Sequence, residues 1–353
     1  MRTAPPSALA SLVRPNPRRV LTLTEGVQMS MAKPFVLEPA RTILRQCLNV
    51  RPGENLLVIS DTGTVAYGEA FVLAGNELGA EVVTTVMAPR TKHGEEPPAT
   101  VAAAMCAADA IVAPTTFSVN HSEARLAASA AGARLIFMPD VCDDVFLDGS
   151  LDIDFMERKA VIDQVARVLD NGTEVRVRSP RGTDLWMSIA AKRAVPQSGI
   201  CHEPGTISPP PCIECAVAPD EGTTTGTMII DGATVPGGPV TEPITATFEA
   251  GRIVALDGGA EADRLRATLD GYGDPNMYCP VEMGMGMNPK ARIGQGGPLE
   301  DEAEFGTMHI GIGNGITFGS SIRAPGHCDL VMRDAVVEVD GQVLLAECEL
   351  HLP

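Results

Sequence analysis

Residues 55–88, NLLVISDTGTVAYGEAFVLAGNELGAEVVTTVMA, decide the fold of the first half of this chain. The segment 55–61 is a compact apolar run that ends in polar residues, as a buried parallel strand does. Helical periodicity follows over 65–80, with a glycine near its end, and 81–88 reads as a second strand. A strand, a helix and a strand in this order predict a βαβ unit, which requires a parallel sheet covered by helices.

The same alternation continues on both sides of this unit. The further helices and strands that the pattern predicts lie over 40–48, 98–110, 110–115, 121–133 and 134–140. An amphipathic helix over 154–170 is expected to close the domain. We therefore predict a parallel α/β domain over residues 31–180. A flexible tail over 1–30 precedes it, because that segment lacks the apolar core of a secretory signal.

The second half has the pattern of antiparallel strands. Short segments such as 173–180 and 184–190 are separated by Pro and Gly, and one helix over 261–269 interrupts them. Asp340-Gly341 stands between two alternating arms and predicts a hairpin turn. We predict a mostly antiparallel, β-rich domain over residues 181–353. Its Gly-rich pieces do not stand between a parallel strand and a helix, so they do not indicate a phosphate-binding loop.

Length and composition exclude several classes of function. The 353 residues carry a net charge of −18, which argues against nucleic acids and anionic membrane surfaces as partners. No apolar run approaches the ~20 residues of a membrane span. The nine scattered cysteines are typical of reduced thiols, so we predict a cytoplasmic protein. Cys212 and Cys215 form one C-x-x-C pair and, without a second pair, are interpreted as small strand residues rather than zinc ligands.

The stretch GTMHIGIGNG carries a histidine in a strand-like, glycine-spaced run. Alternate residues of a strand share a face, so His309 lies on the face of Gly311 and Gly313. Glycine costs a strand roughly 0.5–1 kcal/mol relative to alanine, and it often marks the close approach of another group. In GHCDLVM, His327 and Asp329 also share a face. An imidazole and a carboxylate that project the same way can serve one divalent ion.

Two further acids stand in similar surroundings. Glu282 shares a strand face with Gly284 and Gly286, and Glu214 lies in the small apolar run IECAVAP. A carboxylate in such a run must be paired, protonated or metal-bound if it is buried. The simpler alternatives are a hydrogen-bonded core histidine at 309 and a solvent-exposed acid at 214. The gathering of several ligand types in β segments of one half favours a metal site.

At these residues the sequence resembles a known family. VEMGMGMNP, GTMHIGIGNG and GHCDLVM resemble the C-terminal signature of the aminopeptidase T/aminopeptidase S metallopeptidases, and ECAVAPDEG resembles the segment with their first ligand Glu. The resemblance runs over residues 36–345 and implies a two-domain, dimeric, metal-dependent hydrolase. The ligands that it implies for one or two divalent ions are Glu214, Glu282, His309, His327 and Asp329. Where these aminopeptidases carry a Tyr, this chain has Ile316, which argues against peptide hydrolysis.

The chain also resembles a relative of similar length, the iron-dependent 2,5-dihydroxypyridine 5,6-dioxygenases of nicotinate breakdown. HSEARLAASAAGARLI resembles their helix that begins with a pocket histidine, here His121, and HEPG resembles their E-P-G, here Glu203. GHCDLVMRD resembles the segment that gives the iron a His and an Asp. That enzyme has His where this chain has Glu282, and no histidine that matches His309. A helix-capping region for His121 and solvent exposure for Glu203 are the simpler alternatives.

These patterns lead to one main functional prediction and two alternatives. The main prediction is an aminopeptidase-like hydrolysis of amide or peptide bonds. A divalent Mn, Co or Zn ion would lower the pKa of bound water toward ~7, and Glu214 or Glu282 would take its proton. The first alternative is ring cleavage of a dihydroxypyridine-type compound by mononuclear Fe(II) and O₂, since His309, His327 and Asp329 form a two-His–one-carboxylate set.

In this alternative His121 would handle a substrate proton. The second alternative is a non-catalytic protein that binds a small ligand. The expected partners are a small-molecule or short-peptide substrate and further copies of the chain in a homodimer or higher homo-oligomer.

Overall fold

The computed structural model describes residues 32–120, 122–147 and 149–353. The predicted tail over 1–30 lies outside the described residues. Contacts gather residues 31–353 into one compact unit, and the described residues of that unit form three sheets. The predicted division at residue 180 stays a prediction.

The first sheet is built from the segment that opens the sequence argument. Its strand order is β2-β1-β3-β4-β8, and every pair is parallel. The strands are β1 (Asn55–Asp61), β2 (Glu81–Met87), β3 (Ala110–Thr115), β4 (Arg134–Pro139) and β8 (Ile207–Ser208). β1, β3 and β4 are buried on both faces, which explains their continuous apolar runs. The predicted parallel α/β arrangement is confirmed.

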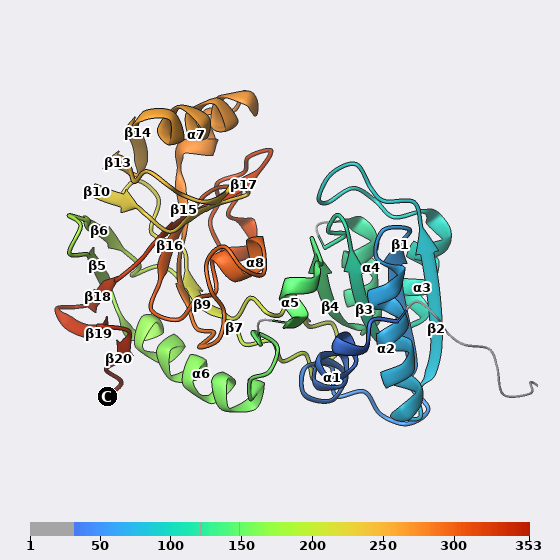
Figure 1. Cartoon of the computed structure of the whole chain (residues 1–353). Helices are drawn as coiled ribbons and strands as arrows, with labels where there is room; N and C mark the ends of the chain where they lie inside the picture. The colour runs from blue at the N-terminus through green and yellow to red at the C-terminus, as the bar shows by residue number, and fades with distance from the viewer. Residues whose placement is uncertain (1–31, 121, 148) are drawn as a thin grey trace, which may run out of the picture. The chain divides into compact units, whose positions relative to one another are not determined.

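Helices cover both faces of this sheet (Figure 1). The described helices over residues 34–171 are η1 (Pro34–Val36), α1 (Leu37–Thr42), the π-helical η2 (Ile43–Cys47), α2 (Val65–Glu77), α3 (Ala99–Ala107), α4 (Glu123–Ala131), α5 (Asp143–Leu147) and α6 (Phe155–Asn171), of which α6 packs elsewhere. Leu56 of β1 lies in one core cluster with Phe71 of α2, whereas Leu57 lies in a second cluster with Met105 of α3. Neighbouring residues of β1 thus face different helices, as the two-residue period of a strand requires.

One helix differs from its predicted place. The helix over 154–170 was expected to close the α/β domain. In the structure α6 packs against β7 (Ala194–Gln197) and β9 (Glu214–Val217), which belong to another sheet. Amphipathic periodicity specifies that a helix has an apolar face, but it does not specify which sheet covers that face.

The two remaining sheets are antiparallel. The eight-stranded sheet has the order β14-β13-β10-β6-β5-β18-β19-β20. Its strands are β5 (Glu174–Arg178), β6 (Asp184–Ser188), β10 (Thr225–Ile230), β13 (Ile244–Glu249), β14 (Arg252–Asp257), β18 (Val336–Val339), β19 (Gln342–Ala346) and β20 (Glu349–Leu350). The helix α7 (Gly259–Gly271) contacts β13 and β14.

The seven-stranded sheet carries the candidate site. Its order is β12-β11-β17-β16-β15-β9-β7. Besides β7 and β9, its strands are β11 (Ala233–Val235), β12 (Gly238–Pro239), β15 (Pro280–Gly286), β16 (Met308–Gly313) and β17 (His327–Met332). Short helical turns lie between them, namely η3 (Pro275–Tyr278), α8 (Pro298–Asp301) and η4 (Ile316–Phe318). The apolar side chains of Met308, Ile310 and Ile312 join the core cluster with residues of the eight-stranded sheet, which leaves the other face of β16 to His309.

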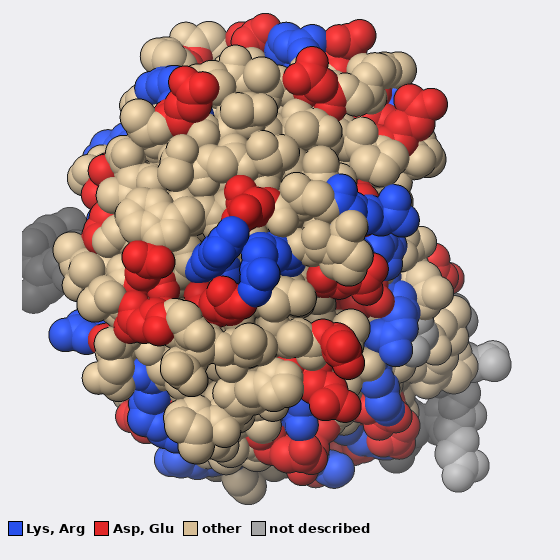
Figure 2. Space-filling view, turned by 90° about the vertical axis from the view of Figure 1, so that its left-hand side faces the viewer, with Lys and Arg blue, Asp and Glu red and all other residues tan. Residues whose placement is uncertain are grey.

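The surface and the helices add two observations. Figure 2 shows acidic and basic side chains interspersed over the face that it draws, as on an ordinary solvated surface. Within the described ranges, the helices are too short or too polar to cross a membrane.

Candidate metal centre

Each predicted ligand on the seven-stranded sheet is paired with a glycine of a neighbouring strand. The pairs are Glu214 with Gly286, Glu282 and Asp329 with Gly311, His309 with Gly284, and His327 with Gly313. A Cβ atom on Gly311 would lie 2.7 Å from His327 Nε2 and 2.8 Å from Glu282 Oε2, closer than real Cβ contacts allow. The glycines therefore leave the space in which the ligand side chains meet.

The five side chains form two groups of three that share Glu282. In each group the potential ligand atoms all lie within 4.8 Å of one another. His309 Nε2 is 3.1 Å from Glu214 Oε2 and 3.5 Å from Glu282 Oε1. His327 Nε2 is 3.1 Å from Glu282 Oε2 and 3.0 Å from Asp329 Oδ1. Residues from β9, β15, β16 and β17 thus converge on one place, as the sequence predicted.

The backbone fixes which nitrogen of His327 faces the carboxylates. Its Nδ1 lies 2.9 Å from the carbonyl oxygen of Asn314, which can only accept a hydrogen bond. Nδ1 therefore carries a proton, and Nε2 of the neutral ring presents a lone pair toward Glu282 and Asp329. Metal-binding histidines commonly donate their second N–H to such a carbonyl. A lone pair that faces two carboxylates requires a cation or a proton between them.

The group around His309 is deeply buried. Glu214 Oε1 accepts a hydrogen bond from Gln197 Nε2 on β7. Burial alone would lower the pKa of His309, but the carboxylates of Glu214 and Glu282 outweigh it and raise that pKa well above its usual value. Burial and the charge of Glu282 raise the pKa of Glu214. In the absence of metal, protons therefore occupy the region between these groups.

In the group around His327, burial and neighbouring carboxylates again have opposite effects on the pKa of the histidine. Burial alone would lower the pKa of His327, but Asp329 and Glu282 raise it well above its usual value. Burial opposes the charge of Asp329 too, yet the neighbouring His327 holds the pKa of that carboxyl below its usual value. A divalent ion can replace the protons that the apoprotein needs here. Imidazole and carboxylate donors together suit Fe(II), Mn, Co or Zn, so these residues fit a metal centre.

The sequence analysis missed a sixth member of the cluster, Glu302. This half-buried residue follows α8, and its carboxyl is hydrogen-bonded to that of Asp329 and to the thiol of Cys212. Burial and the charges of Asp329 and Glu214 raise the pKa of Glu302 well above its usual value. The proton of this pair is therefore on Glu302, whose carboxyl donates a hydrogen bond to the Asp329 carboxylate. Its surroundings in the sequence, GPLEDEAEFG, read as a solvated acidic loop, so no periodic signal marked it.

Of the two predicted pocket residues, only Glu203 lies among the described residues, and it does not join this cluster. His121 lies outside the described residues. Glu203 is exposed in the turn before β8, where its backbone carbonyl accepts hydrogen bonds from Thr206 N and Oγ1. Its carboxylate is not part of either ligand group among the described residues. A pocket role for Glu203 and His121 remains a prediction from resemblance.

Comparison with known proteins agrees with this architecture. Residues 36–352 match the model of the family described as 2,5-dihydroxypyridine 5,6-dioxygenase (NicX). The curated 2,5-dihydroxypyridine 5,6-dioxygenase of Pseudomonas putida KT2440 is 24% identical over 197 residues, which cover 53% of this chain and 56% of that enzyme. The chain thus spans about half the length of this curated relative.

Two solved structures share the fold. The 2,5-dihydroxypyridine dioxygenase structure from Pseudomonas putida KT2440 has a TM-score of 0.78 at 20% identity, covering 90% of this chain and 97% of that one. AmpT from Thermus thermophilus has a TM-score of 0.67 at 16% identity, covering 90% of this chain and 99% of that one. Both similarities confirm the mixed α/β fold, and both relatives are those that the sequence resembles.

Proposed function

This chain belongs to the 2,5-dihydroxypyridine 5,6-dioxygenase family, and we propose that it opens the ring of a hydroxylated heteroaromatic compound with Fe(II) and O₂. The observation that carries this proposal is the group of Glu282, His327 and Asp329, which lies within a chain that matches the family over residues 36–352. The family match favours this reaction over the hydrolysis that was the main prediction. A dihydroxypyridine-type compound is the proposed substrate.

The three residues of this group would hold the ion. Fe(II) in a site with open positions supplies the activation of O₂ beside a bound substrate. His327 presents Nε2 because the carbonyl of Asn314 accepts the proton of Nδ1. The Glu302 carboxyl hydrogen-bonds to the Asp329 carboxylate, and this contact favours the charged form of Asp329 that a cation requires. These partners orient the ligands before any substrate arrives.

Proton handling belongs to Glu214 in this proposal. Burial and the charge of Glu282 raise the pKa of Glu214, which makes its carboxylate a stronger base toward the proton of a substrate hydroxyl. Gln197 holds the other oxygen of the carboxyl and fixes its orientation. Burial of Glu214, Glu282 and His309 excludes bulk water from this side of the cluster.

One observation favours a second candidate, amide hydrolysis. The group of Glu214, Glu282 and His309 adjoins the first group through the shared Glu282, an arrangement suited to two ions bridged by a carboxylate. The chemistry that such a pair supplies is the activation of water against a carbonyl group. AmpT has a similar fold, although Ile316 stands where the aminopeptidase pattern has Tyr.

One experiment separates the two reactions. The full chain, loaded with Fe(II) under argon, is given a panel of dihydroxypyridines and then O₂, and oxygen uptake is followed with the loss of the pyridine absorbance. In parallel, Mn²⁺-loaded protein is incubated under argon with aminoacyl nitroanilides. We expect oxygen uptake that EDTA abolishes and Fe(II) restores. Hydrolysis under argon without oxygen uptake would establish the second candidate, and activity that survives chelation excludes both.

Variants of the ligands test the centre itself. His327→Ala and Asp329→Ala should each lower Fe(II) affinity by about a hundredfold or more while the circular dichroism spectrum stays native. His351→Ala is the matched control, because His351 is exposed and belongs to neither ligand group. Full metal content in Asp329→Ala would remove this residue from the centre.

A further inference from the structure

One side chain of the candidate metal centre is more exposed than the others. Of the five clustered side chains, Glu214, Glu282, His309 and Asp329 are at most 9% exposed, whereas 27% of the His327 side chain is exposed. A substrate that reaches the ligands therefore approaches beside His327. The turn η4 lies at this place, since the ring of Phe318 is 5.7 Å from that of His327, with 30° between the ring planes. Phe318 is half-buried, and so part of it remains free for contact.

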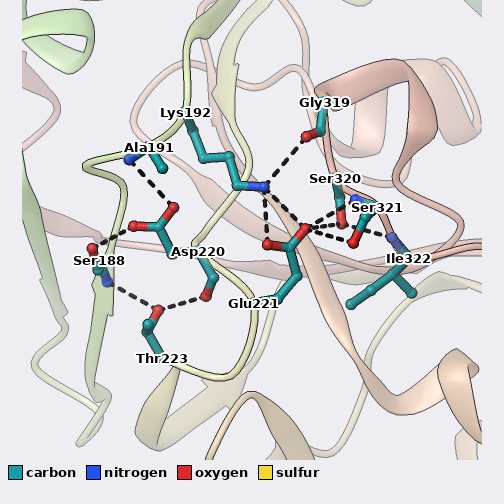
Figure 3. A network of polar contacts seen from close by, with 10 residues as sticks. All are labelled: Ser188, Ala191, Lys192, Asp220, Glu221, Thr223, Gly319, Ser320, Ser321 and Ile322. Atoms are coloured by element: carbon teal, nitrogen blue, oxygen red, sulfur yellow. Dashed lines mark hydrogen bonds and ion pairs between the residues drawn. The ribbon is translucent and has the colours of Figure 1, made fainter.

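Glu221 accepts hydrogen bonds from two residues that follow Phe318, namely Ser320 and Ser321 (Figure 3). Glu221 Oε1 accepts hydrogen bonds from Ser321 N at 2.9 Å and from Ser320 Oγ at 3.1 Å. Lys192 Nζ lies 2.9 Å from the same oxygen and donates to the carbonyl of Gly319. Burial alone would raise the pKa of Glu221, but these donors outweigh it and hold the pKa at about 2. Glu221 is therefore charged at neutral pH and keeps all these contacts.

The same loop supports His327. The carbonyl of Asn314, where the loop begins, accepts the Nδ1 proton of His327, and Asn314 N donates to the carbonyl of Gly326, where the loop ends. Between them, Ser320 N donates to the carbonyl of Gly315. Glu221 follows β9, the strand that carries Glu214. One ionic contact outside the centre thus fixes a loop that supports a ligand and places an aromatic ring beside it.

Resting on the proposed function, we propose that Phe318 receives the aromatic ring of the substrate and determines specificity for planar rings. Lys192 and Glu221 are the positioning pair that holds it. Aromatic rings pack against each other in offset or edge-on contacts, and such a contact contributes about threefold to tenfold in affinity.

The proposed contact between Phe318 and the substrate ring is tested by anaerobic binding of 2,5-dihydroxypyridine to the Fe(II)-loaded full chain. Phe318→Leu should weaken binding about threefold to tenfold, and Phe318→Tyr should restore it, while both variants keep the Fe(II) content of the wild type. Val254→Ala, at an exposed apolar residue of β14, is the control and should bind like the wild type. Rescue by tyrosine separates ring contact from simple packing.

The role of the Lys192–Glu221 pair is tested by combining a Glu221 variant with a Phe318 variant. Glu221→Gln should reproduce part of the Phe318→Leu loss, and the double variant should bind no more weakly than Phe318→Leu alone, because Glu221 acts through Phe318. Asp184→Asn, which breaks the exposed ion pair with Arg176, is the matched control. Ser320→Ala removes one contact of Glu221 and replaces Glu221→Gln if that variant does not fold.

The outcomes separate the inference from the function on which it rests. If the wild type binds the pyridine and Phe318→Leu binds it equally well, the proposed role of Phe318 is refuted and the dioxygenase proposal stands. If Phe318→Leu loses Fe(II), Phe318 supports His327 rather than the substrate, and the inference is again refuted. If the Fe(II)-loaded wild type binds no dihydroxypyridine, both the function and the inference fail.

Discussion

Gly284 and Gly311 occupy positions where any side chain would enter the ligand cluster. Glycine is unfavourable in a strand by roughly 0.5–1 kcal/mol per residue, so its repeated use here lowers the stability of β15 and β16. In return, the two glycines leave room for the clustered side chains. His309 lies opposite Gly284, and Glu282 and Asp329 lie opposite Gly311. At the scale of single residues, the absence of side chains is as necessary to the centre as the ligands are.

Gly284→Ala should weaken metal binding without unfolding the protein. A Cβ atom there would overlap His309 Nε2 and lie 2.9 Å from Glu214 Oε2, so His309 must leave its place. We expect Fe(II) affinity to fall at least about tenfold by calorimetry. Gly271→Ala is the control, since a Cβ at this last residue of α7 meets nothing within 4 Å. Equal affinity in the two variants would contradict the role of Gly284.

The hairpin of β18 and β19 shows how one element is fixed locally and anchored elsewhere. Asp340 and Gly341 have φ of +48° and +77°, and Val339 pairs with Gln342, which defines the two-residue turn that the sequence predicted. Asp340 Oδ1 also accepts hydrogen bonds from Thr173 Oγ1 at 2.6 Å and Glu174 N at 2.9 Å. The turn residue therefore ties the hairpin to the start of β5.

Asp340→Ala should lower the free energy of unfolding by about 1–2 kcal/mol, because it removes these acceptors and places a Cβ-bearing residue without a compensating contact at positive φ. Asp340→Asn should cost less, since asparagine tolerates this conformation and keeps one acceptor oxygen. Urea denaturation measures both, with Asp257→Ala at the exposed end of β14 as the control. A cost in Asp257→Ala as large as that in Asp340→Ala would show that loss of surface charge, rather than the turn, is responsible.

Asn288 joins distant segments of the molecule through one buried amide. Its Nδ2 donates to the carbonyls of Ser150 and Pro211, both at 3.0 Å. Its Oδ1 accepts from Lys290 N at 3.0 Å and Ala291 N at 3.2 Å. Ser150 lies between α5 and α6, whereas Asn288 follows β15 of the metal centre. At the scale of the whole molecule, this side chain connects the ligand-bearing sheet to the first half of the chain.

Asn288→Ala should destabilise the protein by about 2–4 kcal/mol, because it leaves buried carbonyl and amide groups without partners. The measurement is the urea denaturation midpoint of the metal-free chain. Asn276→Ala removes an exposed hydrogen bond to the carbonyl of Arg323 and should cost less than about 1 kcal/mol. Similar midpoints for the two variants would show that the buried amide of Asn288 stabilises the protein no more than an exposed hydrogen bond does.

The sequence predicted much of this architecture, because strands and helices have local periods. The two-residue period of GTMHIGIGNG placed His309 and Gly311 on one face and Met308 and Ile310 on the other, as the core contacts show. The helix over 154–170 was found, but its packing against β7 and β9 was not predicted, since a helical stripe does not specify its partner. The family resemblance was confirmed, whereas the preference for the proposed ring-opening reaction rests on the family match over residues 36–352.

The sequence by itself determined the types of the candidate ligands and the strand face on which each one stands, because both are local properties of the chain. Only the tertiary structure decided that Glu282 is shared by two groups, that Asn314 orients His327, and that Glu302 joins Asp329. These contacts depend on the strand order β17-β16-β15-β9 and on the loops around it. That order follows from the packing of all the strands together, and no local pattern encodes it.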